Sequence, residues 1–467
     1  MNRNAPLPLA GRILAILSLA ACSDLPASAP SLTAPELASV TSSASKGGAP
    51  NAEAALVRQL AAGRGITSLP TPPRVRPQLV RLGQALTFDP ILSGNRDISC
   101  ATCHFPTLGT GDGKSLSIGQ GGSNVGPARS HPQGVFIARN APPLFNLGAM
   151  KHLFWDGRVA DNGAGGVSTP AGALVTPAMQ HVFEFGPISA LGMFPVTNRA
   201  EMRAGTGNEL ADIPDADMQA IWTGLMKRLG AIPEYRAMFE NSYPGTKFED
   251  MTFAHASNAI AGFIVDSYSL ANSPWDQFLA GRDDALTPKQ LEGAKTFLTL
   301  KCSICHSTAT LSDDQFHNVA IAQIGPGQGN GVSLRDDFGR MNVSGDPNDI
   351  YKFRTTPLRN VAVTGPYGHD GSIVSLRRFV EHYSESDLKL TDFNPFEIEP
   401  ALRNTLLVNA APVIAGRDPI IVGVVLTDDL VDKLMDYMGA LTDPAVKDLD
   451  KTIPQHLPSK LAVLRPH

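Results

Sequence analysis

The residues best suited to chemistry form two Cys-x-x-Cys-His motifs, at residues 100–104 and 302–306. In c-type haem attachment, the two thiols form thioether bonds with the haem vinyl groups, and the adjacent histidine ligates the iron. Four of the five cysteines are used in these motifs. The sequence therefore predicts two covalently attached haem c groups. The predicted attachment residues and proximal iron ligands are Cys100, Cys103 and His104, and Cys302, Cys305 and His306.

Two other uses of these cysteines remain open. A four-cysteine zinc site would join halves roughly 200 residues apart and would leave both histidines redundant. A disulfide within each motif is compatible with export, but it also gives the histidines no role. The pattern favours haem over both alternatives.

The fifth cysteine follows a short export signal. Arg3 and Arg12 precede an apolar run at residues 13–19, which is too short to span a bilayer as a mature helix. The segment ending at Cys22 is similar to the lipobox of bacterial lipoproteins, which predicts a signal peptide over residues 1–21 and a lipid on Cys22. Ser23 after the cysteine favours the outer membrane, while cleavage nearby without lipidation is the alternative. Either way, the sequence predicts a periplasmic protein.

The rest of the chain divides by composition. Residues 22–55 are rich in Ala, Ser, Pro and Thr, which predicts a flexible tether. A charged interruption near residue 281 separates two predicted domains, 56–281 and 282–467. The chain has 467 residues, 18% charged residues and a net charge of −5, so a nucleic-acid-binding role is not expected.

Helices are expected to position both motifs. Apolar spacing predicts a helix near residues 80–88, just before the first motif, and another near 287–298, just before the second. Further helices are expected near residues 217–229, 253–270 and 427–441. The last of these is expected to pack on the helix before the second motif. The predicted fold class is therefore mainly α.

Five further blocks carry a resemblance to a known family. They are Arg139-Asn140-Ala141-Pro142, Phe154-Trp155-Asp156-Gly157-Arg158, Pro195 to Met202, Leu358-Arg359-Asn360-Val361 and Pro366 to Gly371. From about Pro70 to Leu441 the chain resembles the bacterial di-haem cytochrome c peroxidase and MauG family. The resemblance implies two cytochrome c-like helical domains, each with one haem c, a calcium ion between them and a peroxide-reacting haem in the N-terminal domain.

The resemblance also implies site residues. Glu201 matches the distal acid/base glutamate, for which the alternative is a surface carboxylate. Trp155 matches a tryptophan between the two haems, although a tryptophan beside a phenylalanine is also common in cores. Calcium maps onto the Asn140 side chain and the backbone carbonyls of Thr364 and Pro366, and Asn140 as a simple turn residue is the alternative.

Two positions depart from the family pattern around the first haem. The family has a glutamine where this chain has Leu191, inside an expanded segment at residues 163–192, and Gln180 is a candidate replacement. Many family peroxidases also have a histidine that blocks the first iron until the second haem is reduced. Gln120 stands there, so the first haem is predicted to be open without reductive activation. His131 is the candidate that could overturn this prediction.

The sixth ligand of the second haem differs between the two branches of the family. Family peroxidases commonly use methionine, whereas MauG-like members use a tyrosine at the position of Tyr383. A phenolate is a hard anionic donor that favours higher iron oxidation states. His382, Met435 and Met438 are competing ligands. His369 also matches a recurrent family position but is not assigned to iron.

These residues favour a MauG-like enzyme that reacts with hydrogen peroxide and oxidises a protein or small-molecule substrate. The alternative is a cytochrome c peroxidase that receives electrons from a small cytochrome c or copper protein. A non-enzymatic di-haem electron carrier is the third interpretation. Contact with a membrane is expected only through the lipid anchor, and homodimers are frequent in the peroxidase branch.

Remaining charged and aromatic residues are expected to be structural. The acidic pairs at residues 313–314 and 336–337 are expected on solvated faces, because paired charges are costly to bury. Trp222 and Trp275 lie in helical patterns and are expected in or near the core.

Overall fold

The computed structural model describes residues 50–407 and 409–466. The predicted signal peptide, Cys22 and most of the predicted tether lie outside these residues. The chain divides into Met1–Ala52 and Glu53–His467, and the second unit contains both Cys-x-x-Cys-His motifs. The packing described below lies within that second unit.

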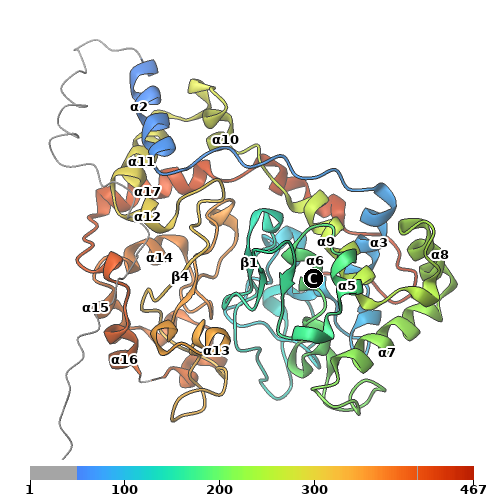
Figure 1. Ribbon diagram of the computed structural model, residues 1–467. Coiled ribbons are helices and arrows are strands. Elements are labelled where there is room, and N and C mark those ends of the chain that lie inside the picture. Colours follow the sequence, from blue (N-terminus) through green and yellow to red (C-terminus); the bar gives the residue numbers. More distant parts are fainter. Residues whose placement is uncertain (1–49, 408, 467) are drawn as a thin grey trace, which may run out of the picture. The chain divides into compact units, whose positions relative to one another are not determined.

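The fold is predominantly helical, as the sequence predicts (Figure 1). The first helix is α2 (Pro50–Gly63). Around the first motif lie α3 (Pro77–Phe88), α4 (Cys100–Cys103), α5 (Pro177–Val182), α6 (Pro187–Leu191), α7 (Met218–Gly230), α8 (Pro233–Ser242) and α9 (Phe253–Tyr268). Around the second lie α10 (Pro274–Leu279), α11 (Pro288–Thr299), α12 (Cys302–Cys305), α13 (Met341–Ser344), α14 (Leu376–His382), α15 (Ser386–Thr391), α16 (Ala410–Ala415) and α17 (Asp428–Ala440).

Strands are short and few in the described residues. β1 (His152–Leu153), β2 (Val159–Asp161) and β3 (Val167–Ser168) form an antiparallel sheet in the order β1-β2-β3. β4 (Phe316–His317) pairs with β5 (Phe353–Arg354), so that Phe316 lies opposite Arg354. This second pair lies close to the second motif.

The helices before the two motifs each cross a partner helix at a glycine. α3 packs on α9, and a Cβ atom on Gly83 would lie 1.9 Å from the carbonyl oxygen of Ala259. α11 packs on α17 as the sequence predicts, and a Cβ atom on Gly293 would lie 2.1 Å from the carbonyl oxygen of Lys433 (Figure 1). Only glycine permits backbones to approach this closely.

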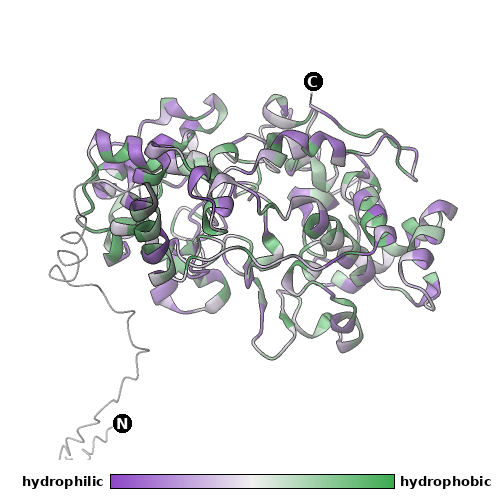
Figure 2. Ribbon diagram, turned by 90° about the horizontal axis from the view of Figure 1, so that it is seen from above, coloured by the Kyte–Doolittle hydropathy of each residue, from purple (hydrophilic) through white to green (hydrophobic). Residues whose placement is uncertain are grey.

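Amphipathic helices explain how these crossings are buried. Thr287 precedes α11, and its side chain caps the helix together with Gln290. The helix buries Ala294, Phe297 and Leu298. Figure 2 shows hydrophilic and hydrophobic residues interspersed along most helices, as expected for helices with one buried face. None of the described helices combines the length and apolar character needed to cross a bilayer.

The hydrophobic residues form two large cores, one beside each motif. The N-terminal core contains residues of α3 and α7–α9, and Cys100 and Cys103 pack against it. The C-terminal core contains residues of α11, α14 and α17, and Cys302 packs against it. Trp222 and Trp275 are buried in these cores, one in each, as expected.

Segments near each end of the described chain pack in the core of the opposite half. The two cores therefore do not follow the predicted domain ranges 56–281 and 282–467. Helix α2 begins within the predicted tether, and its Ala54 and Val57 pack in the C-terminal core. Conversely, Leu449 and Leu457, near the C-terminus, pack in the N-terminal core. Helix α10 also joins the C-terminal core, through Trp275 and Phe278. Local composition does not indicate these long-range contacts, which only the folded backbone brings together.

Candidate functional site

The first motif begins with helix α4 and ends at His104. Ser99 and Thr102 cap α4, and the backbone N–H of Ser99 donates to Oγ1 of Thr102 at 3.0 Å. Nδ1 of His104 lies 3.1 Å from the carbonyl oxygen of Thr110. A ligating histidine normally donates its second ring N–H to such an acceptor, which leaves Nε2 for the metal. Burial lowers the pKa of His104, so its imidazole is held neutral.

The second motif repeats this arrangement. Helix α12 carries the two cysteines, and Nδ1 of His306 lies 3.1 Å from the carbonyl oxygen of Leu311. Burial again lowers the pKa of the imidazole. In both motifs, therefore, Nδ1 of the histidine is held by a backbone carbonyl five or six residues further along the chain.

A cavity of about 450 Å³ lies beside the second motif. Cys302, Cys305 and His306 line it, together with mostly apolar residues of α11, α14 and α17. Two thiols and an imidazole at the wall of an apolar cavity fit a covalently attached haem. They do not fit a four-cysteine zinc site, because the motif at residues 100–104 belongs to the other core.

Four residues are candidates for the sixth ligand of the second haem, and only some of them line the cavity. Among the described residues, Tyr383 and Met438 line the cavity, whereas His382 and Met435 do not. Nε2 of His382 instead lies 2.7 Å from the carbonyl oxygen of Val319. Burial raises the pKa of Tyr383 above its ordinary value. The candidates facing the second haem site are thus one phenol and one thioether.

The predicted relay and calcium residues share a wall of the same cavity. Trp155, Asn140, Thr364 and Pro366 all line it. Nε1 of Trp155 donates to the carbonyl oxygen of Asn140 at 2.9 Å, which fixes the indole. The Asn140 side-chain amide donates to the carbonyl oxygens of Lys114 and Ser115, at 3.0 and 3.2 Å. The two chain segments predicted to bind calcium, at Asn140 and at residues 364–366, therefore line the same cavity as Trp155.

A buried ion network lies beside Trp155. Nε of Arg139 lies 2.6 Å from Oδ2 of Asp337, and its Nη1 lies 2.6 Å from Oδ2 of Asp156. Arg158 adds a contact of 3.0 Å to Asp156. The expectation of a solvated face at residues 336–337 is wrong, since Asp336 and Asp337 are both buried. Arg139 compensates the charge of Asp337, and no local pattern indicates a partner roughly 200 residues away.

Glu201 lies in a short π-helical turn, η7 (Arg199–Arg203), which starts at Asn198. The side-chain oxygen of Asn198 accepts from the backbone N–H of Ala200 at 2.9 Å and of Glu201 at 3.2 Å. Burial raises the pKa of the Glu201 carboxyl, and the positive charges of Arg158 and Arg139 oppose that rise. The environment thus resembles that of a proton-transfer carboxyl more than that of a solvated surface glutamate.

The loop that carries Gln120 packs directly on this turn. The backbone N–H of Gln120 donates to the carbonyl oxygen of Ala200 at 3.1 Å, and its side-chain amide donates to Asp97. His131, the competing ligand, accepts at Nδ1 from the backbone N–H of Gln133 at 3.1 Å. The Gln120 side chain is thus held by Asp97, ahead of the first motif, whereas the partner of His131 lies two residues along the same loop.

The expanded segment at residues 163–192 is folded. It supplies β3, α5 and α6, and both helices pack on α9. The Gln180 amide is used to join α5 to β3: Oε1 accepts from Val167 N–H at 3.0 Å, and Nε2 donates to the Val167 carbonyl at 2.7 Å. Leu191 packs against the N-terminal core. Both ends of the Gln180 amide are therefore used to join α5 to β3.

Comparison with known proteins agrees with these features. The model of the di-haem cytochrome c peroxidase family matches residues 77–284. Methylamine utilization protein MauG of Methylorubrum extorquens is 29% identical over 340 residues, which cover 71% of this chain and 76% of that protein. Cytochrome c551 peroxidase of Pseudomonas aeruginosa is 30% identical over 296 residues, 63% of this chain and 68% of that protein.

A solved structure extends the similarity to most of the chain. The crystal structure of a MauG-like protein associated with microbial copper homeostasis has a TM-score of 0.57 and 26% sequence identity. The match covers 81% of this chain and 95% of that one. Most of the second unit of the chain is therefore shared with this structure.

Proposed function

The chain belongs to the di-haem cytochrome c peroxidase family and is a haem oxidoreductase, and we propose that it is a MauG-like, peroxide-dependent oxidase. The family implies two c-type haems. In the proposal, hydrogen peroxide reacts at the haem of the N-terminal domain. A haem held by the second motif would store or relay oxidising equivalents, and electrons would be withdrawn from a protein or small-molecule substrate.

The residues of the two motifs hold the haems. Cys100 and Cys103 attach the first and His104 ligates it, and residues 302–306 do the same for the second. When bound, a haem supplies an iron that reacts with peroxide and takes up oxidising equivalents. The hydrogen bond from each histidine to a backbone carbonyl holds the ring in place and strengthens the free nitrogen as a donor.

Glu201 moves the proton in this proposal. A peroxide must lose a proton from its near oxygen and gain one at its far oxygen before the O–O bond breaks. A carboxyl with a raised pKa suits both steps, because it holds a proton more readily than an ordinary glutamate and can accept one and return it. Trp155 lines the cavity of the second haem site and relays electrons between the haems.

The observation that carries the MauG-like assignment is Tyr383 at the wall of the cavity beside the second motif. A phenolate ligand favours oxidised iron, which suits a haem that stores oxidising equivalents. Gln120 supports the same reading, since glutamine is a poor ligand and leaves the first iron open. Met438, at the wall of the same cavity, favours the alternative. As a ligand it would support a cytochrome c peroxidase supplied by a small cytochrome c or copper protein.

We further propose the setting in which the enzyme works. The enzyme is located in the periplasm, and a lipid on Cys22 anchors it to the outer membrane. It forms homodimers, as members of the peroxidase branch frequently do. A calcium ion binds the Asn140 side chain and the carbonyls of Thr364 and Pro366. Few protein ligands of this kind, with waters, suit Ca²⁺. The direct test is to measure the calcium content of the purified holoprotein, which should fall in Asn140→Ala.

The deciding experiment is the visible and near-infrared spectrum of the fully oxidised holoprotein, before and after one equivalent of hydrogen peroxide. A new near-infrared band with loss of ferric Soret intensity is expected, since both haems then share the oxidation. A diferric protein that stays inert until one haem is reduced would instead identify a donor-driven cytochrome c peroxidase. Inertness in both states would leave only the electron-carrier interpretation.

A further inference from the structure

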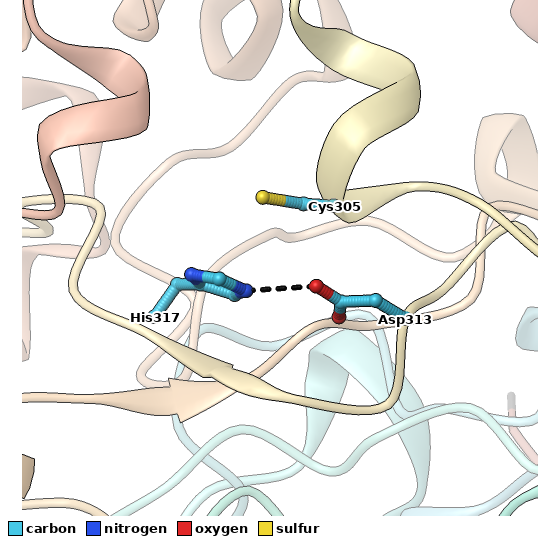
Figure 3. A group of neighbouring side chains, drawn as sticks. All are labelled: Cys305, Asp313 and His317. Carbon is cyan, nitrogen blue, oxygen red and sulfur yellow. Dashed lines mark hydrogen bonds and ion pairs between the residues drawn. The ribbon is translucent and has the colours of Figure 1, made fainter. Parts of the chain in front are cut away.

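A cluster of charged side chains lies against the second motif (Figure 3). The ligand atoms of Cys305, Asp313 and His317 all lie within 4.8 Å of one another. Nε2 of His317 lies 2.9 Å from Oδ2 of Asp313, and its Nδ1 lies 2.5 Å from Oδ2 of Asp418. The imidazole is thus held between two carboxylates.

This cluster does not suit a metal ion in the haem-loaded protein. The sulfur of Cys305 is used in the thioether bond of the second motif. Both nitrogens of His317 are already engaged by carboxylates, so no ring lone pair is free for a metal. The expectation that residues 313–314 lie on a solvated face is also wrong, because the side chain of Asp313 is only 18% exposed.

The geometry determines the charge of His317. A carboxylate oxygen only accepts hydrogen bonds, so each ring nitrogen must carry a proton and donate. Such a ring is an imidazolium. Burial opposes this charge, but the hydrogen bonds to Asp313 and Asp418 raise the pKa of His317 above its ordinary value.

The three groups come from segments that enclose the second haem site. Asp313 follows the motif, and its backbone N–H donates to the Cys305 carbonyl at 2.7 Å. His317 lies in β4. Asp418 caps the turn η14 (Pro419–Ile421), and its backbone N–H donates to the carbonyl of Asn318 at 2.9 Å. His317, Asp418 and the turn all contribute to the cavity wall.

We propose that the Asp313–His317–Asp418 group is a fixed charge cluster that sets the reduction potential of the second haem. His317 acts as a positioning residue, because it neither touches iron nor reacts. The inference rests on the proposed function only in assigning a haem to this cavity. The three side chains are 15–18% exposed, and charges that are largely shielded from water act more strongly on a redox centre than solvated ones.

The sign of each effect follows from charge. His317→Gln removes the positive charge and leaves two carboxylates, which stabilises ferric haem and lowers the midpoint potential. Asp418→Asn removes a negative charge and raises it. His317→Lys keeps the positive charge and restores a potential near that of the parent protein. A purely structural role would move the first two variants in the same direction.

The test is a spectroelectrochemical titration of the purified di-haem protein at pH 7. The second haem is identified as the couple that is lost when Cys302 and Cys305 are both replaced by alanine. The expected change is about tenfold in the ferrous-to-ferric ratio at fixed potential, or about 59 mV for a one-electron couple, in opposite directions for His317→Gln and Asp418→Asn. Asp387→Asn is the matched control, since that carboxylate is 45% exposed and pairs with the neighbouring Arg417.

Equal potentials in Asp418→Asn and the parent protein, or shifts of one sign in both variants, would overturn the inference. Asp418→Asn also keeps the test valid if His317→Gln does not retain haem. The potentials are measured without peroxide, so a protein that is inert to peroxide refutes the proposed function and leaves this inference intact.

Discussion

Glu201 is the residue on which the peroxide reaction is expected to depend. Glu201→Gln removes the proton acceptor and should lower the second-order rate constant with peroxide by about 10²–10⁴-fold. Because burial raises the Glu201 pKa, the rate in the parent protein should rise as pH increases through that raised pKa and then level off. The variant should show no such rise. Stopped-flow absorbance of the diferric protein at several pH values measures both effects.

The control for Glu201 is an exposed glutamate outside the proposed site. Glu234 lies at the start of α8 and is exposed, so Glu234→Gln should react at the parental rate. A parental rate in Glu201→Gln would remove this residue from the mechanism.

Substitutions of Tyr383 and Met438 are expected to have different effects on the spectrum of the second haem. Tyr383→Phe removes the phenol oxygen but keeps the ring, so a phenolate ligand is lost and the ferric spectrum of the second haem changes. Met438→Leu keeps a similar volume at the same cavity and should leave the spectrum unchanged. Visible absorption and electron paramagnetic resonance distinguish the two outcomes. The reverse pattern would identify methionine ligation and favour the cytochrome c peroxidase alternative.

At the scale of elements, the glycine crossings hold each motif in place. Gly293→Ala places a Cβ atom against the Lys433 carbonyl, so α11 and α17 must separate. Overpacking of this kind typically costs about 1–3 kcal/mol of unfolding free energy. Gly439→Ala, near the end of α17, meets no atom within 4 Å and should stabilise by up to about 1 kcal/mol. Guanidinium unfolding measures both, and destabilisation of the same size in both variants would contradict the close-crossing argument.

At the scale of the whole molecule, each chain end stabilises the core of the other half. Leu449 is 3% exposed in the N-terminal core, and Leu449→Ala should cost that core about 2–5 kcal/mol. Val57 is fully buried in the C-terminal core, and Val57→Ala should cost about 1–3 kcal/mol there.

These two variants should affect different haems. Unfolding followed by the ligation bands of each haem should show the first haem perturbed earlier in Leu449→Ala and the second in Val57→Ala. The opposite assignment, with each end stabilising its own half, would refute the crossed packing of the chain ends.

The sequence by itself determined the features that are written locally. The two motifs, the helices before them and the long helices α7, α9 and α17 follow from short-range spacing and caps, and each lies where predicted within a few residues. The candidate site residues were also named from motifs. Their roles stay predictions, but the cavity brings Trp155, Asn140 and Tyr383 to the walls of one site.

Only the tertiary structure decided which distant groups meet. Asp337 pairs with Arg139, Asp418 pairs with His317, and Leu449 reaches the opposite core, although each partner lies at least 100 residues away. Burying a charge is favourable only beside a compensating partner, and an apolar side chain has no local preference between two cores. The pairing is therefore a property of the folded backbone, which is why Asp313 and Asp337, both expected in solvent, lie beside His317 and Arg139 instead.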